Sequence, residues 1–375
     1  MATRALMKDG LGESAIQRIS HGLIAAGATF EPSDFHRDAI RGLDALELKQ
    51  RVHHLVEVIA KHLPADFEQA SIILGQIRNH WDEGEAEDNL RAFAAWPIID
   101  YVSAYGIDSP STALPLLHYL TPMFSAEFAV RPFLEKHPEH TYNEMMFWCL
   151  DQDEHVRRLA SEGIRPRLPW GGQLKQYIKD PTPVIALLDS LLDDPSDYVR
   201  RSVANNLNDI SKDHPDIVIE TCARWLSDRV SARQWIVQRA TRTLVKSGHP
   251  KVFPLLGYTR KPKIKLSPLS LSTEKLQLGE SLEISTQITS TAGSAQHMVI
   301  DYAIHFMKAN GKTKAKVFKW KNLRIKPNET IFLKKIHPIK AITTRSYYSG
   351  RHQIEILVNG KAQTKAFFDL QTHTT

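Results

Sequence analysis

A near-repeat in the middle of the sequence constrains the fold more than any other feature of this 375-residue chain. The segment HVRRLA at residues 155–160 returns as YVRRSVA at residues 198–204, and a fainter copy follows at residues 236–240. Each of the first two copies comes directly after an acidic turn, DQDE or DDPSD, which can cap the helix that begins there. One valine is common to all three copies, with spacings of 43 and 38 residues: Val156, Val199 and Val237.

A period near 40 residues is typical of HEAT-like repeats, in which pairs of helices stack side by side. Each pair buries one face against its neighbours, so that a series of pairs forms an α-α superhelix with a long surface for a partner. We therefore predict a solenoid of HEAT-like repeats in this part of the chain.

The hydrophobic pattern changes near residue 257, from helical spacing to alternation with a period of two. After the Pro- and Lys-rich joint GYTRKPKIKLSP, the segments 276–278, 282–288 and 354–358 alternate as strands do. Asn310-Gly311 and Asn359-Gly360 predict type I′ hairpin turns, in which both central residues need a positive φ. Short strands with regular turns over about 110 residues predict an immunoglobulin-like β-sandwich.

The predicted fold is therefore multidomain, with α and β parts: residues 1–258 form the helical-repeat domain, 259–266 a linker, and 267–375 the sandwich. Charge follows the same division, since the formal net charge of +6 separates into −7 for residues 1–259 and +13 for residues 260–375. A small, strongly basic domain favours a polyanionic partner, most often nucleic acid. The alternative is a Lys-rich surface that only keeps the domain soluble.

Composition and motifs exclude several classes of protein. Two cysteines, Cys149 and Cys222, suit a reducing compartment, and no signal-peptide core or run of 18 apolar residues is found. We expect a soluble, cytoplasmic protein that binds no membrane. The sequence holds no HExxH, Walker A, GxSxG or GxGxxG motif. Its 17 histidines are scattered, so we predict neither a metal site nor a cofactor.

Three carboxylates stand about one repeat apart: Glu127, Glu162 and Asp209 are separated by 35 and 47 residues. Acids at this spacing can share one face of a solenoid, where they would form a candidate catalytic group. The structural alternative is that each acid caps a helix or pairs with an arginine of the next repeat. Trp170 follows on a loop bounded by Pro169 and Gly171, which is unusual for a core residue, although simple packing stays an alternative.

Basic residues in two regions are candidates for contacts with phosphate. Five lie in the repeats, where an arginine can hold a phosphate through two parallel N–H donors: Arg157, Arg158, Arg165, Arg167 and Arg201. Arginine ladders that bind Asp of a neighbouring repeat are the alternative. Three more follow the Asn310-Gly311 turn: Lys312, Lys314 and Lys316. Lysines that alternate with apolar residues are also typical of any half-buried strand.

The blocks DQDEHVRRLASEGIRPRLPW and DDPSDYVRRSVANNLNDISKDHPD resemble the HEAT-like-repeat DNA alkylation repair glycosylases, and the AlkC branch rather than the AlkD branch. The resemblance covers nearly all of residues 5–258, and some AlkC-type proteins carry a C-terminal immunoglobulin-like domain. It implies a bacterial, monomeric enzyme of base excision repair that works near the nucleoid on double-stranded DNA containing alkylated bases. The implied reaction releases N3-methylated bases, 3-methyladenine above all and 3-methylcytosine as a second candidate, without full extrusion of the lesion.

The resemblance also implies a site. Glu127, Glu162 and Asp209 would surround the deoxyribose of the lesion, Trp170 would lie against the sugar, and Arg158 would contact the DNA backbone. These residue types suit the chemistry, because an N3-methylated base is cationic and leaves readily while positive charge develops on the sugar. Fixed carboxylates stabilise that charge, and one can activate the attacking water. We expect Glu162 and Asp209 in these roles, with Glu127 as support.

A second class of function stays open. The chain would then be a non-enzymatic HEAT-repeat scaffold that binds DNA or protein, because a fold does not by itself imply chemistry.

Overall fold

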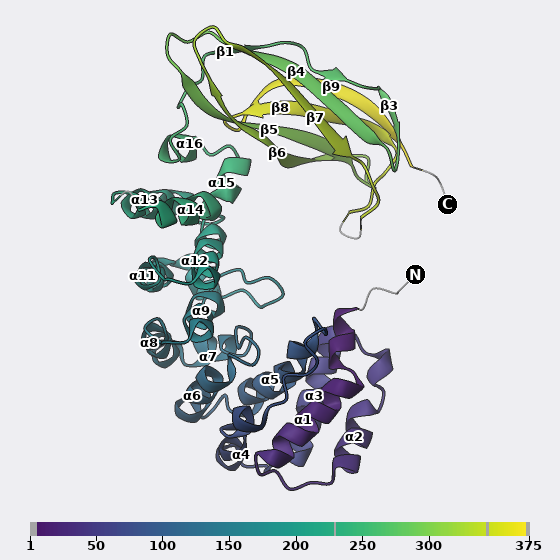
Figure 1. The fold of residues 1–375 in the computed structure, drawn as a ribbon, viewed down its shortest axis with the longest axis vertical. Coiled ribbons are helices and arrows are strands. Elements are labelled where there is room, and N and C mark those ends of the chain that lie inside the picture. Colours follow the sequence, from purple (N-terminus) through teal and green to yellow (C-terminus); the bar gives the residue numbers. More distant parts are fainter. Residues whose placement is uncertain (1–5, 229, 343–344, 373–375) are drawn as a thin grey trace. The chain divides into compact units, whose positions relative to one another are not determined.

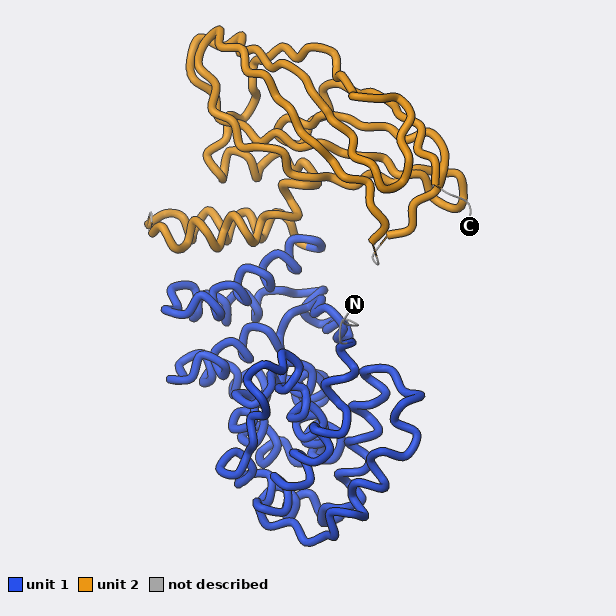
Figure 2. The backbone as a smooth tube through the Cα atoms, turned by 45° about the vertical axis from the view of Figure 1, so that its right-hand side comes forward, with its two compact units in different colours: residues 1–213 blue, residues 214–375 orange. Residues whose placement is uncertain are grey.

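The computed structural model describes residues 6–228, 230–342 and 345–372. The chain divides into two compact units, residues 1–213 and 214–375 (Figure 2). Secondary structure changes at a different point, because the last described helix ends at Leu255 and the first strand begins at Ile264. The boundary predicted at residue 258 follows this change of secondary structure.

The described part of the first unit is built from helices (Figure 1). Its α-helices are α1 Glu13–Ala25, α2 Pro32–Ile40, α3 Leu48–His62, α4 Phe67–Leu74, α5 Trp96–Tyr105, α6 Pro110–Leu120, α7 Arg131–Lys136, α8 Pro138–Trp148, α9 Glu154–Gly163, α10 Lys175–Lys179, α11 Thr182–Ser190 and α12 Asp197–Ile210. Its short 3-10 helices are η1 Met7–Leu11, η2 Leu43–Ala45, η3 Ile77–His80 and η4 Arg91–Ala95.

The repeated sequence motif occupies equivalent helices. HVRRLA lies in α9 and YVRRSVA in α12, and these two helices pack against each other while α8 and α11 pack behind them. The shared valines Val156 and Val199 are both buried. The acidic turns act as predicted at Asp153, whose side chain accepts the N–H of His155 and caps α9. In the second copy, however, the capping atom is the hydroxyl oxygen of Ser196.

The second unit begins with helices and continues as strands. The helices are α13 Pro215–Trp225, α14 Ser231–Ala240, α15 Arg242–Lys246 and α16 Val252–Leu255. The third copy of the motif, residues 236–240, forms the end of α14. The strands are β1 Ile264–Leu266, β2 Ser270–Leu271, β3 Lys275–Gln277, β4 Ser281–Ser290, β5 Gln296–Met307, β6 Thr313–Ile325, β7 Thr330–Pro338, β8 Gly350–Val358 and β9 Lys361–Gln371.

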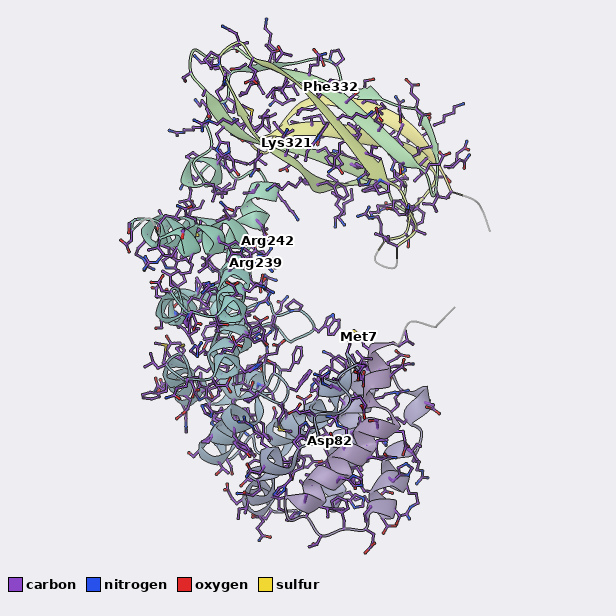
Figure 3. All side chains as sticks on the ribbon, viewed as in Figure 1. Met7, Asp82, Arg239, Arg242, Lys321 and Phe332 are labelled. Carbon is purple, nitrogen blue, oxygen red and sulfur yellow. The ribbon has the colours of Figure 1, made fainter. Side chains whose placement is uncertain are left out.

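The strands form a two-sheet sandwich, as the sequence predicts. In one sheet β4 pairs with β1, β2 and β7, and in the other the order is β3-β9-β8-β5-β6. Alternate residues of β4, β5 and β8 supply the core between the sheets, with Ile284, Ile304 and Ile356 fully buried. Lys321 on β6 and Phe332 on β7 mark one strand of each sheet (Figure 3). Strand β1 lies inside the predicted linker, so residues 264–266 belong to the sandwich.

One of the two predicted hairpin turns has the expected geometry. Asn359 and Gly360 have φ values of 45° and 72°, and they join β8 to β9 as a type I′ turn requires. At Asn310-Gly311 a hairpin joins β5 to β6 as predicted, but the type I′ geometry is wrong, because only Gly311 has a positive φ, of 72°. The amide of Gly311 donates to the carbonyl oxygen of Lys308, and so Asn310 is the third residue of an ordinary turn with a left-handed glycine after it.

Two glycine backbones meet where the helices of the second unit contact the β8–β9 turn. Gly248 has a φ of 72°, and a Cβ atom on it would lie 2.8 Å from the carbonyl oxygen of Gly360. We predict that Gly248→Ala lowers the free energy of unfolding by about 3 kcal/mol, because it adds a backbone clash to left-handed strain. Gly257 is the matched control, since its φ is 77° but the space around it is open.

Urea unfolding of the two variants separates the clash from the strain. Gly257→Ala should cost only about 1 kcal/mol, which is the strain alone. Equal losses of stability in the two variants would contradict the close approach of the two backbones.

Candidate active site

The three predicted carboxylates come from three successive parts of the first unit. Glu127 lies between α6 and α7, Glu162 in the last turn of α9, and Asp209 in the last turn of α12. Because α9 and α12 pack as equivalent helices, their C-terminal ends lie close together. The structure thus brings the three acids into one cluster, and arginine side chains connect them.

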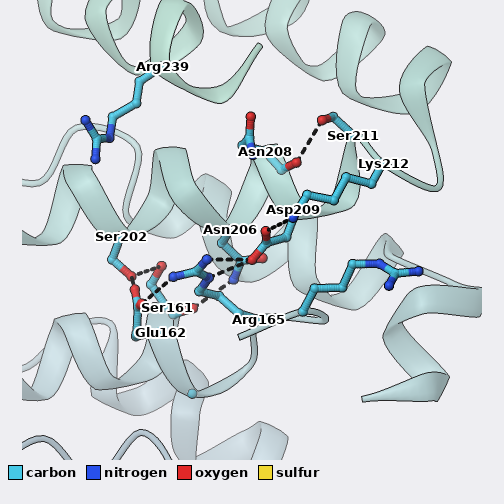
Figure 4. A network of polar contacts seen from close by, with 12 residues as sticks. Ser161, Glu162, Arg165, Ser202, Asn206, Asn208, Asp209, Ser211, Lys212 and Arg239 are labelled. Atoms are coloured by element: carbon cyan, nitrogen blue, oxygen red, sulfur yellow. Dashed lines mark hydrogen bonds and ion pairs between the residues drawn. The ribbon is translucent and has the colours of Figure 1, made fainter. Parts of the chain in front are cut away.

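Arg165 bridges two of the carboxylates (Figure 4). Its Nη1 donates to Glu162 Oε1 at 2.5 Å, and its Nε donates to Asp209 Oδ2 at 2.8 Å. Ser202 donates its hydroxyl to the other oxygen of Glu162, and Lys212 donates to the other oxygen of Asp209. The Glu162 and Asp209 side chains are only 7% and 3% exposed. Both acids are therefore buried and fully paired.

The charges of this cluster are strongly coupled. Burial acts to lower the pKa of Arg165, but the neighbouring charges of Glu162 and Asp209 outweigh it and leave that pKa raised. Arg165 therefore stays cationic at neutral pH. Its N–H donors point to the two carboxylates, which leaves its predicted phosphate contact without support from this geometry.

Glu127 differs from the other two acids because its side chain reaches an open cavity of about 640 Å3. It is 15% exposed and pairs with Arg158, whose Nη1 lies 2.6 Å from Glu127 Oε2. Ser125 donates its hydroxyl to the same carboxylate oxygen at 2.9 Å. The Arg158 guanidinium lies 4.9 Å from the centre of the Tyr198 ring, and both residues line the cavity. Glu127 is thus the acid placed to meet a ligand.

Arg158 also links the two halves of the cluster, since its Nη2 lies 3.6 Å from Glu162 Oε1. Burial acts to lower the pKa of Arg158, but the charges of Glu127 and Glu162 leave that pKa raised. Arg158 is therefore a fixed cation between two acids.

The remaining predicted arginines lie in different surroundings. Arg157 pairs with both oxygens of Asp194 at 2.6 and 3.1 Å, and Arg167 pairs with both oxygens of Asp213 at 2.7 Å. These pairs match the ladder arrangement considered as the alternative to phosphate binding. Arg201 is exposed, and within the described residues it forms no ion pair, so it fits a phosphate contact better than Arg157 does.

Trp170 lies on the loop between α9 and α10, as predicted, and is 60% exposed. Its φ is 66°, a left-handed conformation that is rare for a bulky residue and costs about 1–3 kcal/mol. Such strain in an exposed aromatic residue, beside a cluster of charges, is typical of a functional site.

Three residues near Trp170 escape detection in the sequence: Lys49, Asp100 and Arg131. Together with Trp170 they line a cavity of about 410 Å3. Burial raises the pKa of Asp100 to about 7, against the opposing effects of Trp96, whose Nε1 donates to it at 3.0 Å, and of the Lys49 charge. No motif marks these residues, because they come from three helices and meet only in the fold.

The predicted lysines of the sandwich lie at the outer strand of one sheet. Lys314 and Lys316 on β6 pair with Phe306 and Ile304 on β5, and so they share the face of the sheet that builds the core. Lysines that point inward at an edge strand prevent it from pairing with another strand. Lys314, Lys316 and Arg345 line a cavity of about 690 Å3, while Lys312 is exposed in the adjoining turn.

Residues 6–228, 230–342 and 345–372 contain neither a metal-binding cluster nor a helix that could span a membrane. In these ranges no group of three or more His, Cys, Asp or Glu side chains is placed to hold a metal ion. No helix in the same ranges is long and apolar enough to cross a membrane.

Fold and site together define a class: a protein of stacked helical repeats with a cluster of paired carboxylates and arginines, followed by an immunoglobulin-like sandwich. Comparison with known families agrees with this. The family model of DNA alkylation repair enzymes matches residues 124–244, which include the whole carboxylate cluster and Trp170. The model of the C-terminal immunoglobulin-like domain of the uncharacterised protein YhaZ matches residues 265–372.

Two relatives match the chain along nearly its whole length. The uncharacterised protein YhaZ of Bacillus subtilis (strain 168) is 35% identical over 366 residues, which are 97% of this chain and 99% of the relative. The alkylpurine DNA glycosylase AlkC of Pseudomonas fluorescens, solved bound to DNA containing an abasic site analog, has a TM-score of 0.91 and 35% identity, and the match covers 98% of this chain and 100% of that one. The chain belongs to the AlkC-like DNA alkylation repair family, as its sequence motifs predict.

Arg165 and Arg167 allow a matched test of stability, because the ion pairs of Arg165 are buried and those of Arg167 are partly exposed. We predict that Arg165→Met lowers the free energy of unfolding at pH 7 by about 3 kcal/mol, because it leaves two buried carboxylates without their shared partner. Arg167→Met is the control: the pair it breaks is 30% and 22% exposed, and its loss should cost about 1 kcal/mol or less.

Urea unfolding of both variants at pH 7 checks this. Equal losses of stability in Arg165→Met and Arg167→Met would contradict the difference in burial between the two sets of ion pairs.

Proposed function

We propose that this protein is a DNA glycosylase that hydrolyses the N-glycosidic bond of cationic N3-alkylated bases and so begins base excision repair. The observation that carries the proposal is the cluster of three carboxylates, held in one arrangement by Arg158 and Arg165. Trp170 lies on the same α9–α10 loop as Arg165. The 0.91 TM-score to AlkC supports it, because that enzyme binds DNA with an abasic site analog, the product state of such a reaction. The proposed substrates are 3-methyladenine and 3-methylcytosine in double-stranded DNA.

The reaction needs little more than fixed negative charge and a water molecule. The bond from C1′ to the base nitrogen breaks, the bonding electrons leave with the cationic base, and the sugar acquires positive charge. Water then adds its oxygen to C1′ and gives up a proton. A carboxylate beside C1′ stabilises the sugar cation and accepts that proton.

Glu127 is the acid that we assign to the sugar. It lines the open cavity, whereas Glu162 and Asp209 are buried behind it and paired with Arg165. This assignment differs from the expectation from the sequence, which gives Glu162 and Asp209 the catalytic roles and Glu127 a supporting one. Glu162 and Asp209 then act through position: Arg158 lies between Glu127 and Glu162 and fixes the direction of the Glu127 carboxylate. A preorganised carboxylate gives the most stabilisation, because it need not reorient as charge develops.

Affinity for DNA must come from cations, because the carboxylates repel phosphate. We assign part of it to the sandwich, whose outer strand carries Lys314 and Lys316 in a cavity that Arg345 also lines, with Lys312 exposed in the adjoining turn. In the repeats, Arg201 is the exposed arginine that we assign to a phosphate. Trp170 is assigned to the face of the sugar, where its ring stabilises the developing cation.

We predict that Glu127→Gln lowers the single-turnover rate of base release about 100-fold or more, since it removes the charge nearest the sugar. The measurement is release of 3-methyladenine from methylated duplex DNA together with formation of alkali-labile abasic sites. Glu139→Gln is the control, because Glu139 is an exposed acid at the start of α8 that takes no part in the ion pairs of the cluster.

The outcomes separate the two classes of function. If the wild-type protein binds methylated DNA but releases no base, the scaffold function replaces the glycosylase, and the paired carboxylates are then only structural. If wild type is active and Glu127→Gln keeps its full rate, the assignment of Glu127 is wrong and Glu162→Gln becomes the next variant to examine.

We also predict that changing Lys312, Lys314 and Lys316 together to Gln reduces the salt dependence of DNA binding. If each lysine neutralises one phosphate, the slope of log K against log salt falls in magnitude by about 2–3. The control replaces Lys263, Lys265 and Lys361, which are equally exposed but lie toward the other end of strand β5. The same slope in wild type and the first variant would contradict this assignment.

A further inference from the structure

We propose that Lys49 is a positioning residue that holds the Trp170 loop in its strained conformation and ties it to the segment carrying Glu127. The expected effect of Lys49 on the reaction rate rests on the proposed glycosylase function. The contact between Lys49 and the Trp170 loop does not depend on that function. Lys49 lies in α3, 121 residues before Trp170, and its Nζ donates to the carbonyl oxygen of Trp170. This hydrogen bond therefore acts directly on Trp170, the residue with the strained backbone.

The Trp170 loop needs such contacts because its backbone is unfavourable. A tryptophan at a φ of 66° relaxes to a negative φ unless neighbouring groups prevent it. Within the loop, the amide of Gly171 donates to Leu168, and the amide of Leu174 donates to Pro166. Neither bond involves a polar atom of Trp170, so they close the loop without fixing the direction of the indole ring.

Arg131 at the start of α7 anchors the two ends of the loop. Its guanidinium donates to the carbonyl oxygens of Gly163 and Arg165 at 2.7 and 2.9 Å, and to that of Gly172. Burial lowers the pKa of Arg131 to about 10, so the side chain is still cationic at neutral pH. Arg131 therefore sets where the loop begins and ends, and Lys49 acts on its tip.

Lys49 also contacts the Glu127 segment. Its ammonium lies 5.6 Å from the centre of the Phe128 ring, within the range of a cation–π interaction. Phe128 directly follows Glu127, and its ring stacks on Trp96 at 5.6 Å. One ammonium group thus joins the carbonyl of Trp170 to the residue beside Glu127. Lys49 therefore restrains the Trp170 loop relative to the segment that carries Glu127.

Because Lys49 is exposed, replacing it can test its effect on the loop separately from its effect on the stability of the protein. Lys49 is an exposed side chain, so its loss should leave global stability nearly unchanged. Arg131, by contrast, is buried, and its removal would endanger the fold. Lys49→Met therefore tests the loop without unfolding the protein, and Lys61→Met is the matched control, since Lys61 lies on the same helix and pairs with Asp38.

The experiment combines hydrogen exchange with a double-mutant cycle. In Lys49→Met we expect amide exchange in residues 168–174 to rise about tenfold without DNA, the single-turnover rate to fall about tenfold, and DNA affinity and unfolding midpoint to stay unchanged. Lys49→Arg should recover most of the rate, because it restores a donor. In a Trp170→Ala background, Lys49→Met should have no further effect on the rate.

The results that overturn the proposal differ from those that overturn the glycosylase function. Unchanged exchange in residues 168–174 overturns it whether or not the protein is active. A tenfold loss that persists in the Trp170→Ala background, or a loss confined to DNA affinity, assigns Lys49 to a phosphate contact instead. A wild-type protein that releases no base overturns the glycosylase function, and the exchange result then still decides the role of Lys49 in the loop.

Discussion

Arg165 joins the ends of two successive repeat helices by pairing with Glu162 on α9 and with Asp209 on α12. Arg165 is the partner that the two carboxylates share, and breaking a buried ion pair costs several kcal/mol. The same pair of bonds therefore holds the two repeats in register and fixes two negative charges in place. Arg158 extends this arrangement by one residue, to Glu127, which is the member of the cluster that lines an open cavity. Structure and chemistry here depend on one set of ion pairs.

The three acids are assigned different roles because they differ in burial. Glu162 and Asp209 lie inside the protein, and their carboxylates are occupied by bonds from Arg165, Ser202 and Lys212. Glu127 lines a cavity, and Trp170 stands exposed on a strained loop that Arg131 anchors. A cationic sugar placed between a fixed carboxylate and an indole ring meets stabilisation that grows with its charge, which is how a site favours a transition state over the substrate.

The sequence predicts those features that arise from neighbours along the chain. The repeat motif, the Asp153 cap and the Asn359-Gly360 turn depend on residues a few positions apart, and the structure confirms them. The sequence also brings Glu127, Glu162 and Asp209 together through their spacing, but it cannot say which acid Arg165 or Arg158 pairs with. Lys49 and Trp170 are 121 residues apart and share no pattern, so only the fold joins them. The Asn310 turn differs from its prediction because an extra residue in the loop lets Gly311 alone take the left-handed conformation.

In the proposed reaction, fixed negative charge and not a general acid drives the cleavage of the glycosidic bond. Duplexes that carry a single lesion test it directly: one series with cationic 3-methyladenine or 3-methylcytosine, and one with the neutral base 1,N6-ethenoadenine, each incubated with excess enzyme. We predict release of the cationic bases and no detectable release of the neutral base, since the neutral base needs a proton donor before it can leave. Release of ethenoadenine at a rate comparable to that of the cationic bases would contradict it.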